Sequence, residues 1–123
     1  MRIERFEDIE AWREGRKSVD MIYDISESDG FSQDYSVKNQ IRSAAVSVMS
    51  NISEGFDRGT NREFIQFLAI ARTSATEVKS QLYVASDRRY IERGQFESIY
   101  NQATSVRNLI NGFIRYLKNV QRK

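Results

Sequence analysis

Residues 40–55 read QIRSAAVSVMSNISEG, and the spacing of their side chains decides the fold class of the chain. Around this stretch, apolar side chains recur every three or four positions, as they do on one face of an amphipathic helix. A polar row follows the edge of that face at spacings of seven, four and three, and it consists of Gln40, Ser47, Asn51 and Glu54. Three roles fit such a row: a catalytic site, a contact with nucleic acid, or a device that holds helices together.

The same helical spacing predicts three further helices and no strand. The predicted helices cover residues 8–25, residues 32–55, a segment that begins at residue 61, and residues 95–120. Turn signals separate them around Gly30, at FDRGT (56–60) and at SDRRYIERG (86–94). The first helix carries a stripe that consists of Ile9, Trp12, Arg16, Val19 and Ile22 or Tyr23.

Polar side chains mark the predicted beginnings of the first three helices. Asp8, Ser32 and Thr60 can each accept a hydrogen bond from a free backbone N–H group in the first helical turn. Thr60 is followed three residues later by Glu63, which is the spacing of a capping box.

Glycines occupy two kinds of position. Gly55 and Gly59 can adopt the left-handed conformation that ends a helix. Gly15 and Gly112 fall inside predicted helices, where glycine costs about 1 kcal/mol relative to alanine. Glycine at such positions predicts a close approach of two backbones, either within one bundle or between subunits.

The lengths of the segments determine how they pack. Helices of about 18–26 residues are about 27–39 Å long at 1.5 Å per residue. Short connections between helices of this length make neighbouring helices antiparallel. The sequence therefore predicts an all-α, antiparallel up-down-up-down four-helix bundle that forms a single domain over residues 1–123.

The composition excludes several kinds of chemistry. The 123 residues include no cysteine and no histidine, which leaves no disulfide, thiol nucleophile, imidazole base or Cys/His metal site. Glu54 and Glu77 form the only candidate carboxylate pair, whereas bundles that hold two metals typically add two Glu-x-x-His motifs. We therefore expect no enzymatic activity, no cofactor and no metal.

The N-terminal stretch MRIERFEDIEAW is charged and lacks the apolar segment of a signal peptide. No apolar run approaches the roughly 20 residues that a membrane-spanning helix needs. We expect a soluble, cytoplasmic protein without a membrane partner.

The polar row has a counterpart on the third helix, where Ser74 and Gln81 are seven residues apart and Glu77 lies between them. Polar groups beside an apolar face are usually paired when they are partly buried. We expect them to bond across a seam between two helices or between two subunits. The expected seam residues are Gln40, Arg42, Ser47, Asn51, Glu54, Gly55, Ser74 and Glu77.

The quoted stretch also resembles a family signature. It is similar to the signature of the small four-helix bundle proteins encoded in intervening sequences of bacterial 23S ribosomal RNA genes. The accessory variability determinant (Avd) proteins of diversity-generating retroelements look like relatives of that group. The residues that match the signature are Gln40, Arg42, Ala44, Ser47, Asn51, Glu54 and Gly55. Ser43 and Ser53 stand where the signature usually has Arg and Ala.

The resemblance extends to FEDIEAWREG (6–15), to Arg58 and to FLAIARTSATEV (67–78). It implies a closed bundle that assembles as a homopentamer and has no enzymatic activity. The retroelement relatives bind RNA and a reverse transcriptase, so structured RNA and a reverse transcriptase are the partners that the resemblance implies.

Charge is distributed unevenly along the chain. Residues 1–37 hold ten acids and five bases, whereas residues 98–123 hold five bases and no acid. On the fourth helix, Arg107, Arg115, Lys118 and Arg122 lie within about 80° of one another, on the side away from the apolar stripe. With Lys123, they are the candidate residues for RNA phosphates. A solvated helix face with cations near a helix C-terminus explains the same pattern.

The sequence thus favours a non-enzymatic, self-assembling four-helix bundle that serves as an RNA-binding or reverse-transcriptase accessory scaffold. The alternative is a protein–protein interaction module with no nucleic-acid role, whose charges only keep it soluble.

Overall fold

The computed structural model describes residues 3–120, and helices are the dominant elements of this part of the chain. The helices are α1 (Glu10–Ser26), α2 (Tyr35–Phe56), α3 (Asn61–Asp87) and α4 (Arg93–Val120). Two short 3-10 turns, η1 (Phe6–Asp8) and η2 (Phe31–Gln33), precede α1 and α2. Residues 3–120 contain no strand, and none of their helices has an apolar stretch long enough to cross a bilayer.

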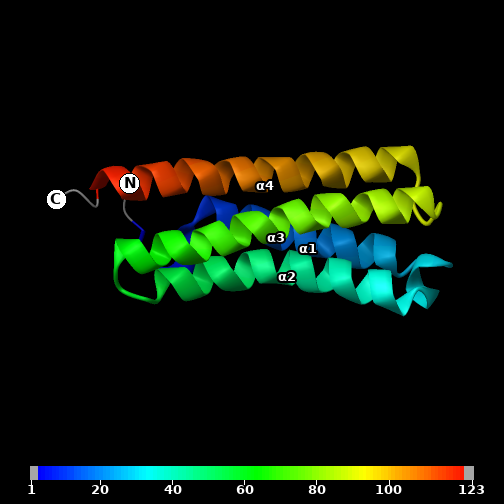
Figure 1. Cartoon of the computed structure of the whole chain (residues 1–123), viewed down its shortest axis with the longest axis horizontal. Coiled ribbons are helices and arrows are strands. Elements are labelled where there is room, and N and C mark those ends of the chain that lie inside the picture. Colours follow the sequence, from blue (N-terminus) through cyan, green and yellow to red (C-terminus); the bar gives the residue numbers. More distant parts are fainter. Residues whose placement is uncertain (1–2, 121–123) are drawn as a thin grey trace.

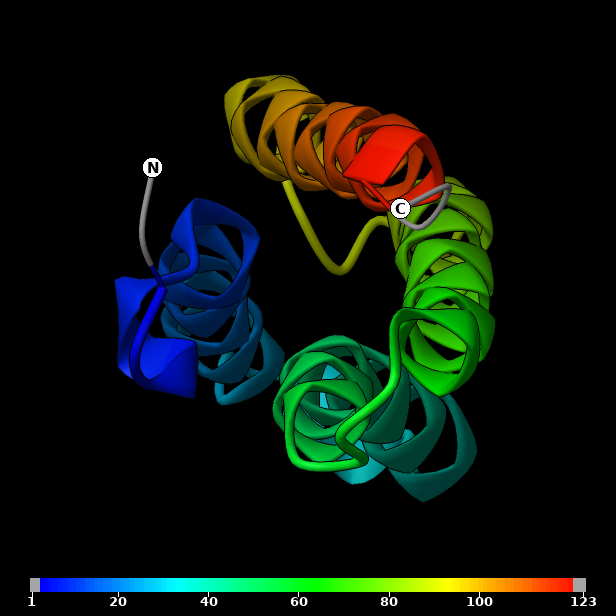
Figure 2. The ribbon, with the colours of Figure 1, turned by 90° about the vertical axis from the view of Figure 1, so that its left-hand side faces the viewer.

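Successive helices run in opposite directions along the long axis of the molecule (Figure 1). Seen from one end, the four helices are arranged in chain order around the axis of the bundle, and α4 contacts α1 (Figure 2). The predicted all-α four-helix bundle is therefore confirmed, and its helices have the predicted up-down-up-down order.

The beginnings of α1 and α3 differ in how they are capped. The Thr60 hydroxyl accepts a hydrogen bond from the backbone N–H of Glu63 at 3.2 Å, so Thr60 caps α3 as predicted. The prediction for Asp8 is wrong, because the N-cap of α1 is Ile9, which has no polar side chain. The Asp8 carboxylate instead accepts bonds, each 3.3 Å long, from two backbone N–H groups that precede it.

Asp34, and not Ser32, caps α2, and it also joins the loops at one end of the bundle. One carboxylate oxygen accepts a bond from the backbone N–H of Val37 at 3.2 Å, and the other accepts one from the Tyr90 hydroxyl at 2.7 Å. Tyr90 follows α3, and its ring stacks on buried Phe31 with 5.3 Å between ring centroids. The Tyr90 bond and then the Val37 bond lower the pKa of Asp34.

The buried side chains of α2, α3 and α4 follow the predicted spacing of three or four residues, and they include Ile41, Val48, Ile52, Leu68, Ala75, Leu82, Ile99, Val106 and Ile110. The predicted stripe of α1 is only partly right, since Arg16 and Tyr23 are exposed. The buried face of α1 consists of Ala11, Gly15, Ser18, Ile22, Ile25 and Ser26. A Cβ at Gly15 would lie 3.4 Å from Val48 Cγ1, so small residues let α1 pack closely on α2.

Gly55 has a different role from the predicted one. Gly59 adopts the left-handed conformation, with φ at 92°, but Gly55 lies within α2 and has no positive φ. A Cβ on Gly55 would lie 2.7 Å from Phe67 Cβ and 2.9 Å from Phe64 Cδ1. Gly55 therefore allows α2 and α3 to approach more closely than any larger residue would permit.

Replacing Gly55 by alanine should force α2 and α3 apart. We expect Gly55→Ala to lower the free energy of unfolding by about 1–3 kcal/mol, the usual cost of overpacking. The matched control is Gly112→Ala, because a Cβ there meets only the end of the Arg115 side chain, at 3.7 Å. That control should stabilise the protein by up to about 1 kcal/mol, since alanine is the better helix former. Urea denaturation measures both, and equal stabilisation by the two substitutions would contradict the close contact.

Replacing Tyr90 by phenylalanine removes the hydroxyl and keeps the ring, so it tests the bond to Asp34 alone. This bond holds the pKa of Asp34 below its usual value of 3.8, so its stabilisation is present above that value and is lost as pH falls through the lowered pKa. We expect Tyr90→Phe to melt at a lower temperature than the wild type near neutral pH. The two melting temperatures should converge as the solution is acidified. Tyr116→Phe is the control, because the Tyr116 hydroxyl has no hydrogen bond among residues 3–120.

Candidate nucleic-acid interface

Two residues of the polar row, Ser47 and Asn51, lie between α2 and α3 with Ser74 of the counterpart row. The hydroxyl groups of Ser47 and buried Ser74 are hydrogen-bonded across the two helices at 2.9 Å. The side-chain amide of Asn51 donates to the backbone carbonyl of Ser47 at 2.8 Å and to its hydroxyl at 2.9 Å. This part of the row is a seam within one chain, and its polar groups satisfy one another.

Arg42 points toward α1 instead. Its Nε donates to the hydroxyl of buried Ser26 at 2.8 Å, and its guanidinium lies 4.2 Å from the centroid of the Tyr23 ring. The bond satisfies a side chain that would otherwise be buried without a polar partner from another helix. Arg42 therefore links α2 to α1 by a hydrogen bond, and Ser47 links α2 to α3 in the same way.

Glu54 does not bond across helices, contrary to the expectation for the seam. Its side chain is exposed and pairs at 3.8 Å with Arg58, four residues later. Gln40 also bonds within its own segment, donating to the Ser36 hydroxyl at 2.9 Å. A surface ion pair such as Glu54–Arg58 contributes little to stability.

Glu77 lies at a polar hollow of about 440 Å³ between α2 and α3. The hollow is lined by Asn39, Gln40, Ser43, Ala44, Ser47, Glu77 and Gln81. Gln81 Oε1 is buried and has no hydrogen-bond partner in residues 3–120. Glu54 does not line this hollow, so the two candidate carboxylates do not share it. No group of three acidic side chains in the described part of the chain is placed to hold a metal ion.

The predicted cations of α4 lie along its border with α3. The Nε of Arg107 donates to the Thr76 hydroxyl of α3 at 3.2 Å, so Arg107 does not point straight into solvent. Arg115 and Lys118 are exposed further along α4. Arg122 and Lys123, which were predicted with them, lie outside the described residues.

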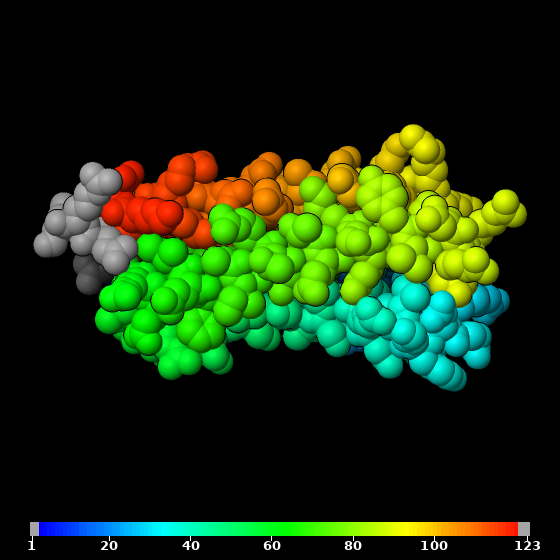
Figure 3. Space-filling model, viewed as in Figure 1, coloured from blue at the N-terminus to red at the C-terminus, as the bar shows by residue number. Residues whose placement is uncertain are grey.

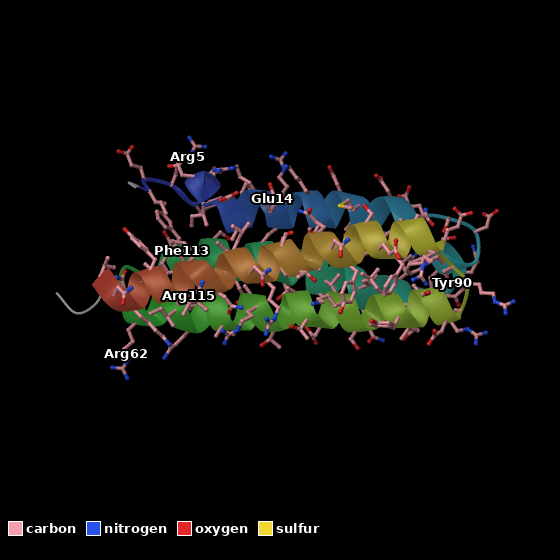
Figure 4. All side chains as sticks on the ribbon, turned by 90° about the horizontal axis from the view of Figure 1, so that it is seen from above. Arg5, Glu14, Arg62, Tyr90, Phe113 and Arg115 are labelled. Carbon is pink, nitrogen blue, oxygen red and sulfur yellow. The ribbon has the colours of Figure 1, made fainter. Side chains whose placement is uncertain are left out.

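Helix α3 adds cations to the same border. Arg72 donates from Nη1 to Asn111 Oδ1 of α4 at 2.9 Å, and the Lys79 ammonium lies 4.6 Å from the centroid of the Tyr100 ring. Arg62, in the first turn of α3, extends outward at the same end of the molecule as Arg115 (Figure 4). The outer surfaces of α3 and α4 lie side by side along the molecule (Figure 3).

We name this surface the α3–α4 basic face, and it consists of Arg72, Lys79, Arg107, Arg115 and Lys118. Within residues 3–120, none of these five side chains forms an ion pair. Only the α4 half of this face is predicted from the sequence. The spacing of seven between Arg72 and Lys79 indicates one helical face, but not that this face meets α4.

The opposite border of α4, toward α1, has a different charge. The amide of Gln102 donates to Glu14 Oε1 at 3.0 Å and to the Glu14 backbone carbonyl at 2.9 Å. The bond from Gln102, and then the one from Lys17, lower the pKa of Glu14, which keeps this carboxylate charged. The α1 border of α4 therefore carries a carboxylate, whereas the α3 border carries cations that form no ion pair in residues 3–120.

Comparison with known proteins identifies the family of the chain. A family model described as the 23S rRNA-intervening sequence protein matches residues 7–112. Among solved structures, the chain is similar to a protein of unknown function from the S23 ribosomal protein family of Bacteroides thetaiotaomicron, with 25% identity and a TM-score of 0.77. That match covers 85% of this chain and 97% of the other. No curated protein matches the sequence. Because the family model spans most of the chain, the protein belongs to the family of 23S rRNA-intervening sequence proteins.

Proposed function

We propose that this protein is a non-enzymatic RNA-binding scaffold that assembles into a ring of five subunits. The observation that carries the proposal is the α3–α4 basic face, where five cations gather without an acidic partner in the described residues. Lysine and arginine side chains that neutralise phosphates supply most of the affinity of non-specific RNA binding. The family's link to ribosomal RNA genes supports the same class of ligand.

The geometry of the face suits phosphates. Arg72 and Arg107 are each held by one bond to a neutral partner, at 2.9 Å to Asn111 and at 3.2 Å to Thr76. A guanidinium has five N–H donors, so most donors of each side chain remain for a ligand. Fixing an arginine before binding also reduces the conformational entropy that binding would cost.

Self-assembly and a reverse-transcriptase partner enter the proposal through the resemblance to the retroelement accessory proteins. A ring would repeat the α3–α4 basic face around its circumference, and the repeated fields would add. RNA that touches several subunits would then bind more tightly than one face alone allows.

One observation favours the alternative, a protein–protein interaction module. An apolar groove of about 320 Å³ lies between α1 and α4. Ile9, Ala11, Leu109 and Phe113 line it, with half-exposed Tyr116 at its edge. Figure 4 shows Phe113 on the side of α4 that faces α1. A protein partner in this groove would not account for the cations of the α3–α4 basic face, which form no ion pair in residues 3–120. We therefore favour RNA binding.

The proposal predicts RNA binding that weakens steeply with salt. Each phosphate contact contributes about −0.7 to −0.9 to the slope of log K against log salt concentration. The double variant Arg115→Glu/Lys118→Glu should therefore lose about two contacts and show a slope shallower by about 1.5. Fluorescence anisotropy with a labelled RNA hairpin measures the slope.

The control is Arg16→Glu/Lys17→Glu, which makes the same charge change on exposed residues of α1. It should keep the wild-type slope. If both double variants reduced the salt slope equally, RNA binding would depend only on the total charge of the protein. A wild type that binds no RNA at about 50 mM salt would favour the interaction module.

The proposed ring predicts a defined mass in solution. Light scattering or native mass spectrometry should give about five times the 14.4 kDa mass of one chain. The mass should stay constant on dilution to micromolar concentration, because ring closure makes each subunit contact two neighbours. A monomer at that concentration would contradict the ring.

A further inference from the structure

The α3–α4 basic face ends in an exposed aromatic cluster. The cluster consists of Tyr83 of α3 and Phe96 and Tyr100 of α4. Phe96 and Tyr100 are partly buried and pack against the core, whereas Tyr83 remains 53% exposed. An aromatic ring normally gains free energy by burial, so an exposed ring held in place needs an explanation.

The ring of Tyr83 is held by its two neighbours. It meets Phe96 edge-on, with 5.0 Å between centroids and planes 62° apart. It meets Tyr100 at 5.9 Å and 79°. Phe96 and Tyr100 stack on each other at 5.4 Å and 21°, which makes a fixed base for the Tyr83 ring. Tyr83 is therefore held in one orientation by two ring contacts while it remains 53% exposed to solvent.

The cluster continues the row of cations. Arg72, Thr76, Lys79 and Tyr83 are spaced by four, three and four residues, so they share one face of α3. The Lys79 ammonium lies 4.6 Å from the centroid of the Tyr100 ring, one helical turn before Tyr83. An RNA strand whose phosphates lie along the cations would bring a base to the aromatic cluster.

Resting on the proposed RNA binding, we infer that Tyr83 is a stacking platform for an unpaired RNA base. Bases inside a continuous A-form duplex are stacked on one another and are not open to such a ring, whereas loops, bulges and single strands expose them. The ligand class is therefore RNA with unpaired bases beside its phosphates, and Tyr83 selects it over a blunt duplex.

Tyr83 lies at the outer edge of the core. Its ring is 53% exposed and contacts only partly buried Phe96 and Tyr100 of the residues in the aromatic cluster. Removal of the Tyr83 ring should therefore leave the core residues in place and the bundle folded, with some loss of stability from the two ring contacts.

The test compares three labelled RNAs of equal length: an unstructured single strand, a hairpin with a loop, and a blunt duplex. In fluorescence anisotropy, Tyr83→Ala should lower the affinity for the single strand and for the hairpin by about 5- to 150-fold, which is the range for loss of one stacking aromatic side chain. The duplex affinity and the salt slope should not change, because stacking involves no ion pair. Tyr83→Phe should bind as the wild type does.

Tyr35→Ala is the matched control. Tyr35 is 63% exposed and has the Lys38 ammonium 4.9 Å from its ring centroid, but it lies at the start of α2. It should bind all three RNAs as the wild type does. A second measurement needs no variant: 2-aminopurine in the hairpin loop should lose fluorescence on binding the wild type, as stacked bases do.

The outcomes separate the two proposals. The platform would be overturned if the wild type bound RNA but Tyr83→Ala left the affinity for the single strand unchanged. It would also be overturned if Tyr83→Ala weakened the affinity for the duplex as much as that for the single strand. Either result would leave the scaffold proposal standing. Unchanged 2-aminopurine fluorescence in the bound hairpin would overturn the platform as well. A wild type that binds none of the three RNAs would overturn the scaffold proposal and, with it, the platform.

Discussion

The close contact between α2 and α3 is the constraint on which the rest of the structure depends. At one end, the absence of a Cβ on Gly55 lets α2 approach Phe64 and Phe67. About two turns away along α2, the hydroxyls of Ser47 and Ser74 bond at 2.9 Å. Two contacts along one antiparallel pair fix the distance between the helices and the rotation of each about its axis. Once the rotation of α3 is fixed, each of its side chains is assigned to a neighbour or to solvent.

That rotation separates the charges of α3. The carboxylate of Glu77 lines the hollow beside α2, while the cations of Arg72 and Lys79 contact residues of α4. The chain as a whole carries a formal charge of only +2, which alone indicates no anionic ligand. Segregation of the charges on opposite borders of one helix produces the local positive field that the total conceals.

The sequence predicted the parts of the fold that large aliphatic side chains mark. Helices α2, α3 and α4 present branched or aromatic residues to the core, so their spacing alone identified the buried face. Helix α1 uses Ala11, Gly15 and Ser18 there, and small residues carry no hydrophobic signal of their own. The α3 half of the basic face was missed for a related reason: Arg72 and Lys79 are far from α4 in sequence, and only the tertiary register brings them to it.

The residues that match the family signature are mostly different from those on which the proposed RNA binding depends. Arg42 bonds to Ser26 of α1, and Ser47 bonds to Ser74 of α3, so this motif on α2 holds both neighbouring helices. The contacts of such a motif specify how the helices pack. Membership in the family thus accounts for the bundle of this chain. The proposed RNA partner rests mainly on side chains outside the signature, at the border of α3 and α4, where cations that form no ion pair in residues 3–120 lead to the exposed ring of Tyr83.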